Sequence, residues 1–510
     1  MSVTRKVLLA LAVTASVCAV TAGASAGVFT VAPLTGVSGA SPFAGCTAGA
    51  APGSVLYPNA EEEPWVDVNP TNPLNLIAVW QQDRWSDGGA HGLVTAVSHD
   101  GGQTWTRTFP HFSICAGGTA QNGGAYERAS DPWVSFGGDG TAYQVSLSFN
   151  AADAINAVLA SRSTDGGNTW SEPVTIIRDS GDRDVSYAFN DKESVTADPT
   201  TAGYAYAVWD RFVTPSGTSR ASIEGLIHSR SFREPIWFSR TTDGGQTWEP
   251  ARNIYDRSEF NGTIGNQIVV AKNGDLLNFL DEFFIHKNAD KMRGEWMSVI
   301  RSTDKGVTWS KESTVVAPSR EIGAFDPDTR RPIRAEGGLP EVAIDRASGA
   351  LYVVWQDASF SGVDEIALSM STDNGHTWSL PIKVNQTPRS STPANQQAFV
   401  AGVHVAADGT VAVTYYDFRN NDSNSGVPTD YWIVHCHAVC SSPTNWGGES
   451  RLTTASFDIE QAPAARGPFG YFLGEYEGLT SIGNVFMPVF VAVNNGNAAN
   501  RTDVFSTTAG

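Results

Sequence analysis

The sequence predicts an all-β fold made of repeated four-stranded units. One eight-residue phrase with the pattern [ST]-x-Asp-x-Gly-x-Thr-Trp recurs at Ser98–Trp105, Ser163–Trp170, Thr241–Trp248, Ser302–Trp309 and Ser371–Trp378. Pairs of apolar-alternating segments lie between the copies. The copies are roughly 60–80 residues apart, the length of a four-stranded propeller blade with its loops. The repetition therefore favours a single β-propeller over several unrelated domains.

Each copy of the phrase suits a tight turn. The Asp can accept hydrogen bonds from backbone N–H groups two residues further on, and Gly supplies a positive φ. The closing Trp is expected to pack into a core between strands. The phrase is therefore interpreted as structural, on the turn between the third and fourth strands of a blade.

The strands are expected in pairs along the chain, because period-2 alternation and β-branched residues are typical of strands. The predicted pairs are 64–69 with 77–80, 132–136 with 143–147, 194–197 with 206–209, 267–270 with 276–279, 342–344 with 351–355, 403–405 with 411–415, and 479–482 with 485–491. The sixth pair is followed by a strand at 431–436 and by a degenerate phrase, Ser442–Trp446, and the seventh by one more strand near 503–506.

Seven pairs predict seven blades, with six as the alternative. The last unit lacks an outer strand, and residues 28–31 or their neighbours could supply it and close the ring. The predicted domains are a signal peptide at 1–26, an N-terminal segment at 27–60 that closes the ring, and the propeller at 61–510.

The first 26 residues have the features of a secretory signal. Arg5 and Lys6 precede an apolar run from Val7 to Val20, and Ala24-Ser25-Ala26 is a small-residue cleavage site. No later stretch is long and apolar enough to span a bilayer. We therefore expect secretion to the cell exterior or the periplasm.

Four cysteines follow the signal, and an oxidising compartment favours two disulfides. Cys436 and Cys440 lie across a local turn, so the other pair is Cys46 with Cys115.

The net charge is −19, and loss of Arg5 and Lys6 makes it more negative. This charge argues against a nucleic-acid partner or insertion into an anionic membrane. A monomer is expected.

The face opposite the repeated turns is the expected working face. It gathers the starts of the inner strands, the ends of the second strands and the longest connections, and binding residues concentrate on such loops. Inner strands begin near acids such as Glu61-Glu62-Glu63, Asp131 and Glu193. Second strands end in Asp or Asn, three of them followed closely by Arg. Carboxylates and guanidiniums around one mouth suit sugar recognition or acid/base chemistry.

The repeated phrase resembles the Asp box of the sialidase (BNR-repeat) superfamily, and the resemblance covers nearly the whole chain after the signal. It implies a Tyr nucleophile, which Tyr476 in Tyr476-Glu-Gly-Leu479 matches, and a Glu that activates it, best matched by Glu341 with Glu336 second. The family's acid/base Asp corresponds to Asp83 or Asp87 in the first blade.

The family also grips the substrate carboxylate with three arginines. The first of them stands in a Phe-Arg-Ile-Pro phrase, but Glu63-Pro-Trp-Val66 occupies that place here. Arg128-Ala-Ser-Asp131-Pro132 is similar to the family's Arg-x-Gly-Asp-Pro phrase. The basic residues that could form a different clamp are Arg84, Arg128, Arg211, Arg334 and Arg419.

Three functions follow as hypotheses. The first is a glycoside hydrolase of the exo-α-sialidase type acting on a glycan. The second is another carbohydrate-active propeller, either a two-carboxylate hydrolase or a polysaccharide lyase, which the missing arginine favours. The third is a non-catalytic propeller that binds glycan or protein. No cofactor is expected, although carboxylates near the channel could hold Ca²⁺.

Overall fold

The computed structural model describes residues 27–180, 187–214, 233–258, 261–285, 292–335, 338–466 and 470–510. The predicted signal peptide and the second candidate glutamate, Glu336, lie outside these residues.

The described chain is built from antiparallel four-stranded meanders that follow one another in sequence. The first meander consists of β2 (Leu56–Val68), β3 (Leu76–Trp85), β4 (Ala90–Ser98) and β5 (Thr106–Thr108). The second consists of β6 (Arg128–Phe136), β7 (Ala142–Phe149), β8 (Asn156–Ser163) and β9 (Val174–Asp179). The pair Ala90↔Ala129 joins β4 of the first meander to β6 of the second. The next two are β10 (Tyr187–Ala197), β11 (Ala205–Thr214), β12 (Ile236–Thr241) and β13 (Arg252–Tyr255), then β14 (Asn261–Val270), β15 (Leu276–Ile285), β16 (Met292–Ser302) and β17 (Thr314–Pro318).

Three further groups complete the series. They are β19 (Glu341–Ile344), β20 (Leu351–Asp357), β21 (Glu365–Ser371) and β22 (Ile382–Lys383); β23 (Ala398–Val405), β24 (Val411–Asp417), β25 (Pro428–Cys436) and β26 (Gly447–Arg451); and β30 (Gly478–Ile482), β31 (Val485–Val493) and β32 (Thr502–Ser506) with β1 (Thr35–Gly36). The predicted strand pairs fall within these elements, except that β2 ends at Val68, one residue before the predicted end of its segment.

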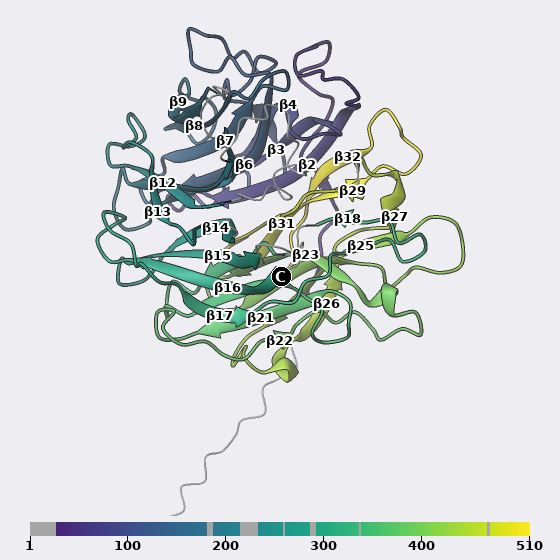
Figure 1. Cartoon of the computed structure of the whole chain (residues 1–510). Helices are drawn as coiled ribbons and strands as arrows, with labels where there is room; N and C mark the ends of the chain where they lie inside the picture. The colour runs from purple at the N-terminus through teal and green to yellow at the C-terminus, as the bar shows by residue number, and fades with distance from the viewer. Residues whose placement is uncertain are drawn as a thin grey trace, which may run out of the picture.

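The sheets are arranged in a circle. Figure 1 shows them running from β2–β4 at the top, through β14–β17 on the left and β21–β22 at the bottom, to β31 and β32 beside the start. β2 packs against β30, β31 and β32, so the first and last sheets are neighbours. β1 pairs antiparallel with β32 through Thr35↔Ser506 and Gly36↔Phe505, and Val31 forms an isolated bridge with Ala509. The N-terminal segment thus adds an outer strand to the last sheet.

The long connections between β17 and β19 and between β26 and β30 contain small elements that the sequence did not predict. β18 (Ile333–Arg334) pairs in parallel with β29 (Gly470–Phe472), which also pairs with β28 (Ala464–Ala465). β27 (Phe457–Asp458) adds to β25, and three 3₁₀ turns are η1 (Pro393–Gln396), η2 (Pro443–Asn445) and η3 (Ile459–Gln461). β18 and β29 carry Arg334 and Phe472 to the working face.

The core lies between successive sheets, and its largest members differ from the prediction. The fully buried tryptophans are Trp80, Trp209 and Trp355, each at the fifth residue of a second strand. The five tryptophans of the repeated phrase are only partly buried, packed at the edges of the apolar clusters. A Trp at the end of an exposed turn reaches one rim of the sheet, whereas second-strand residues have sheets on both sides.

The repeated phrase forms the same turn at each of its five places, between the third and fourth strands of a meander as predicted. In the third copy, Gly245 N–H donates to Thr241 Oγ1 (2.9 Å), and Thr247 donates from its N–H (3.0 Å) and its hydroxyl (2.7 Å) to Asp243. The hydrogen bonds from the Thr247 N–H and hydroxyl lower the pKa of Asp243 to about 2. The Asp therefore binds N–H groups three and four residues further on, rather than two.

An arginine directly before three of the turns joins neighbouring sheets. Arg162, Arg240 and Arg301 donate to backbone carbonyls in the next turn, those of Gly244 (2.8 Å), Lys305 (2.6 Å) and Asn374 (2.5 Å). These bonds tie the outer edge of each sheet to the next.

Arg240→Met should lower the free energy of unfolding by about 1.5–3 kcal/mol, because the charged donor to the Lys305 carbonyl is lost. Met is chosen because Met370 occupies the equivalent position before the fifth turn. Urea unfolding measures the change. Arg389→Met, on an exposed loop, is the control. Equal stability of the two variants would contradict a role for Arg240 between the sheets.

Both predicted disulfides are present. Cys46 is bonded to Cys115 and Cys436 to Cys440, with Cα–Cα distances of 5.6 and 5.8 Å. Disulfides are typical of proteins outside the cytoplasm. Within the described residues, no helix has the length and apolar character needed to cross a membrane.

Candidate functional site

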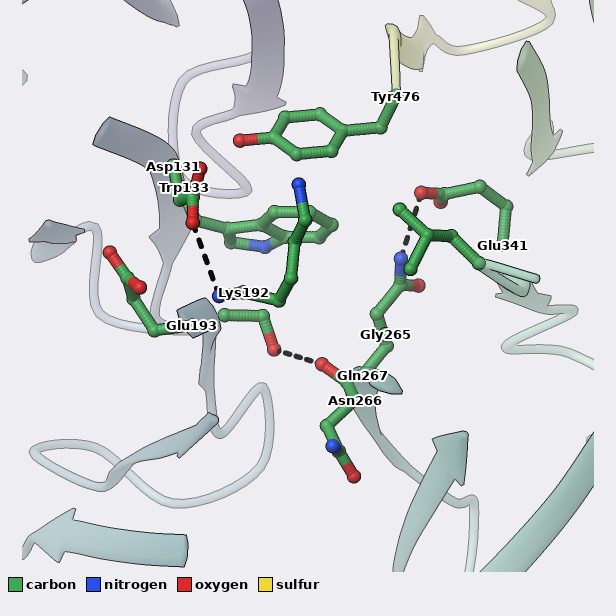
Figure 2. Close-up of a pocket in the computed structure, with 11 residues that line it drawn as sticks. Asp131, Trp133, Lys192, Glu193, Gly265, Asn266, Gln267, Glu341 and Tyr476 are labelled. Carbon is green, nitrogen blue, oxygen red and sulfur yellow. Dashed lines mark hydrogen bonds between the residues drawn. The ribbon is translucent and has the colours of Figure 1, made fainter. Parts of the chain in front are cut away.

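One pocket opens where the inner strands approach one another, at the bulges within β6, β10 and β14 and at the start of β19. Its walls come from β6, β10, β14, β19 and the segment before β30, and are Asp131, Trp133, Lys192, Glu193, Ser194, Gly265, Asn266, Gln267, Leu339, Glu341 and Tyr476 (Figure 2). The free space is about 20 Å³, close to what one water molecule needs. The pocket therefore has room for one water molecule or for one small substituent of a ligand.

A repeated backbone bulge positions these side chains. The register shifts at the same place in β2, β6, β10, β14 and β23, and each bulge holds a residue with positive φ: Glu63 (54°), Asp131 (53°), Lys192 (51°), Gly265 (72°) and Val400 (51°). This conformation disfavours side chains, above all a β-branched one. Because the same conformation recurs at five bulges in the inner strands, we infer that the bulges serve to position the side chains of these residues.

Aromatic rings form one wall of the pocket. Trp133 stacks on Trp65 with 3.6 Å between ring centroids, and Tyr476 meets Trp133 edge-on at 5.3 Å. The Tyr476 hydroxyl donates to the Pro132 carbonyl (3.3 Å). Burial, and then the nearby carboxylates, raise the pKa of Tyr476 well above its usual value. Tyr476 is thus held as a neutral phenol.

Two carboxyl groups in the pocket have pKa values shifted in opposite directions. Glu341, at the start of β19, is buried and accepts a hydrogen bond from Gln267 Nε2 (2.8 Å), and burial raises its pKa to about 8. Burial also acts on Asp131, but the Lys192 charge and the Ser130 hydroxyl (2.8 Å) outweigh it, so the pKa of Asp131 is lowered. At neutral pH one group carries a proton and the other is ionised.

A third carboxyl group, Glu193, has no hydrogen-bond partner for either oxygen within the described chain. Its exposed fraction is 2%, and burial raises its pKa well above the usual value. Figure 2 shows Glu193 and Asp131 on one side of the pocket and Glu341 with Gln267 on the other.

The basic groups nearby are bound to acids of the protein itself. Lys192 Nζ contacts Glu63 Oε1 (3.4 Å) and forms an ion pair with Glu475, which also pairs with Arg334. Arg84 pairs with Glu62 (3.2 Å). The guanidiniums of Arg84 and Arg334 lie 4.7 and 4.9 Å from the centre of the Phe472 ring, so these two predicted arginines contact the same side chain.

The remaining predicted residues lie away from the pocket lining. Asp83 accepts hydrogen bonds from Ser41 (2.7 Å) and the Asn59 N–H (2.8 Å) and contacts His91 (3.1 Å), and these interactions outweigh burial and lower its pKa. It thereby fixes the N-terminal segment to β3 and β4. Asp87 pairs with Arg128 (2.9 Å), whose guanidinium also donates to the Gly49 and Gly88 carbonyls.

Arg211 lies on β11, and Arg419 follows the end of β24. Arg211 pairs with Asp179 and lies over Trp237. Arg419 pairs with Asp417 (2.6 Å) and Glu449 and lies 3.7 Å from the Trp432 ring centre. The structure thus brings Tyr476 and Glu341 together in the pocket, places Arg334 and Arg84 beside it, and puts the other predicted residues elsewhere.

Sequence reasoning missed Trp133, Lys192 and Gln267 as pocket residues. One signal could have found the first: Glu63-Pro-Trp-Val66 and Asp131-Pro-Trp-Val134 repeat one phrase, acid then Pro-Trp-Val, at the two bulges whose tryptophans stack. Lys192 has no such signal, because the corresponding residues of β2 and β6 are acidic.

Metal binding finds no support in the part of the chain that the structure describes. There, no group of three or more His, Cys, Asp or Glu side chains is arranged to hold a metal ion.

The buried acids make stability depend on pH. Burial raises the pKa of Glu341 to about 8 and that of Glu193 well above its usual value. The folded protein keeps these protons at a pH where the unfolded chain releases them, so Glu341 lowers stability by up to about 1.4 kcal/mol per pH unit between about pH 4.5 and 8.

We expect a higher free energy of unfolding at pH 5 than at pH 8 in urea titrations, and a shallower slope for Glu341→Gln. Stability that rises over this range would show that these carboxyls are ionised in the fold.

Comparisons with known proteins bear on the repeat and the overall fold. Residues 96–107 match the family model of the BNR/Asp-box repeat, so the chain contains this repeat, as predicted. No match was found among curated proteins.

Solved structures resemble the fold at low identity. The Hadza microbial sialidase Hz136 is 16% identical with a TM-score of 0.45, over 86% of this chain and 74% of that one. The NanB sialidase from Streptococcus pneumoniae, in complex with a substituted ethanesulfonate, is 11% identical with a TM-score of 0.44, over 89% and 93%. The α-L-arabinanase of Penicillium chrysogenum, complexed with arabinobiose, is 12% identical with a TM-score of 0.41, over 94% and 98%.

Proposed function

We propose that this chain is a secreted, monomeric glycoside hydrolase built on one seven-bladed β-propeller. The seven meanders are its blades, residues 27–60 close the ring, and residues 1–26 are a signal peptide. The pairing of β1 with β32 and the packing of β2 against β30–β32 support closure. The two disulfides support an extracytoplasmic location.

The observation that carries the proposal is the pair of carboxyls with opposed pKa shifts in one pocket, Glu341 and Asp131. A carboxyl protonated at neutral pH beside an ionised one is the arrangement that glycoside hydrolysis requires. Glu341 protonates the leaving glycosidic oxygen as the general acid. Asp131 stabilises the developing positive charge at the anomeric carbon, or removes a proton from the attacking water. The aromatic wall of Trp133 and Tyr476 supports a sugar ring at the pocket mouth.

A panel of fluorogenic glycosides tests the proposal, with Asp131→Asn as the variant and Glu312→Gln as the control, since Glu312 has an 83% exposed side chain. Turnover of at least one glycoside by the wild type and the control, lost in Asp131→Asn, supports it. Glycan binding without turnover by the wild type would instead support a binding propeller. An unsaturated product would indicate a lyase.

A sialidase-type mechanism is the second candidate, because Tyr476 and Glu341, the predicted nucleophile and its activating base, do line the same pocket. The two mechanisms differ in what they need from Tyr476. The raised pKa of its phenol opposes nucleophilic attack, and its hydroxyl is bound to a backbone carbonyl.

Tyr476→Phe is expected to retain most of its turnover, because the ring keeps its packing and the carboxyl mechanism does not use the hydroxyl. Steady-state kinetics on the substrate found in the panel measures this. A fall by orders of magnitude, with an intact fold, would assign the nucleophile to Tyr476 and favour the sialidase-type mechanism.

A further inference from the structure

We propose that the site selects an uncharged sugar and rejects carboxylated ones, because the protein's own carboxylates already occupy the cations around the pocket. This inference rests on the proposed function and specifies its substrate class. It concerns Lys192, Arg334 and Arg84 and the acids that bind them.

Each of the three cations forms an ion pair with an acid of the protein itself. Lys192 is bound by Glu63 and Glu475, Arg334 by Glu475, and Arg84 by Glu62. The side chains of the three acids are at most 1% exposed, so these charges face one another away from water. A substrate carboxylate would have to displace a buried ion pair, leaving an internal carboxylate unpaired at high cost.

The lining offers an anion little attraction. Of its three carboxyl groups Asp131 is ionised at neutral pH, and none of the described lining residues is an arginine. Lys192 is the lining cation, and its charge is shared between two acids. An additional negative charge would therefore lie near the ionised Asp131, in a site where burial, and then the charge of Asp131, already raise the pKa of Glu193.

The hydrogen-bonding groups fit a neutral sugar. Both oxygens of Glu193 are buried and unpartnered within the described chain, and its raised pKa favours the protonated acid, which has one O–H donor and one carbonyl acceptor to satisfy. Sugar hydroxyls donate as well as accept, whereas an ionised carboxylate only accepts. A hydroxyl in the water-sized space beside Glu193 would satisfy it, and Trp133 offers an apolar face for the ring.

Matched substrates test the inference. The wild type is assayed with two matched pairs of fluorogenic substrates, glucoside with glucuronide and galactoside with galacturonide, and also with an α-L-arabinoside and an α-sialoside. Turnover is measured for each substrate, and binding is measured by intrinsic tryptophan fluorescence. Each uronide differs from its partner only by a carboxylate in place of a hydroxymethyl group. We expect the neutral member to bind or react better by on the order of tenfold or more, because a like charge enters a desolvated site. Equal or better use of any carboxylated member overturns the inference.

The variant Glu475→Gln gives the more direct test of charge selection. It keeps the size of the side chain but removes the negative charge that Lys192 and Arg334 share. Its preference for neutral over carboxylated ligand should fall several-fold or reverse, whereas Glu312→Gln should keep the wild-type ratio. An unchanged ratio in folded Glu475→Gln overturns the inference. If that variant does not fold, Glu62→Gln, which frees Arg84, is judged by the same ratio.

The two proposals fail in different ways. Preferential binding of neutral sugars without turnover would refute the hydrolase and leave the charge selection intact. Turnover of a carboxylated sugar in preference to its neutral partner would support the hydrolase and refute the selection. No binding of any member overturns both.

Discussion

Glu341→Gln is expected to lower glycoside turnover by about 10²–10⁴-fold, the usual contribution of a general acid. Gln keeps the size of the side chain and can still bind Gln267 across 2.8 Å, so the fold should persist. What is lost is the proton that burial holds on Glu341 up to about pH 8. Steady-state rates on the substrate found in the glycoside panel measure the loss.

The pH profile distinguishes loss of an acid from distortion of the site. In the wild type, activity should fall as pH rises through about 8, where Glu341 loses its proton. The residual activity of Glu341→Gln should lack that alkaline limb. A substrate with a better leaving group, which needs less protonation, should be affected less. A variant that keeps wild-type turnover would remove Glu341 from the mechanism.

Trp209→Ala is expected to lower the free energy of unfolding by about 3–5 kcal/mol, the range for deleting a fully buried aromatic side chain. Trp209 has no exposed surface, and its Nε1–H donates to Asn190 Oδ1 (2.8 Å), so the change opens a cavity and leaves a buried acceptor unsatisfied. Urea unfolding at fixed pH measures it.

Trp248→Ala is the matched comparison, since this partly buried Trp belongs to the same sheet and packs at the edge of the same apolar cluster. Its effect should be clearly smaller than that of Trp209→Ala. A larger effect at Trp248 would mean that the repeated turns, rather than the second strands, carry the core.

The repeated turns and the strand pairs could be predicted because their signals are local. Ser or Thr, Asp, Gly, Thr and Trp within eight residues define a turn wherever they occur, and alternation defines strands. The disulfides followed from the number of cysteines and the short Cys436–Cys440 spacing. Tyr476 and Glu341 were placed by resemblance, and they do share a pocket.

The rest of the site depends on interactions that no local pattern encodes. The ion pair of Lys192 with Glu475 joins segments far apart in the sequence, and that of Arg84 with Glu62 joins two adjacent strands. The prediction of an arginine clamp assumed that the guanidiniums are available to a substrate, but in the structure each of the five forms an ion pair with an acid of the protein. Asp83 similarly matched a family position, yet here it binds Ser41 and Asn59 of the N-terminal segment, whose path the sequence alone did not reveal.

The pairing of β1 with β32 has a consequence for the order of folding. Thr35 pairs with Ser506, so the outer edge of the last sheet is completed by residues that precede the first sheet in the chain. Most sheets can form as a nascent chain lengthens, because their strands are sequential, but this one must wait until β32 has emerged. The Cys46–Cys115 bond and the contact of Ser41 with Asp83 hold the early segment against the first sheet during that wait. The slowest step of folding should therefore be the final docking of the two ends, during which an unpaired strand edge is open to other chains.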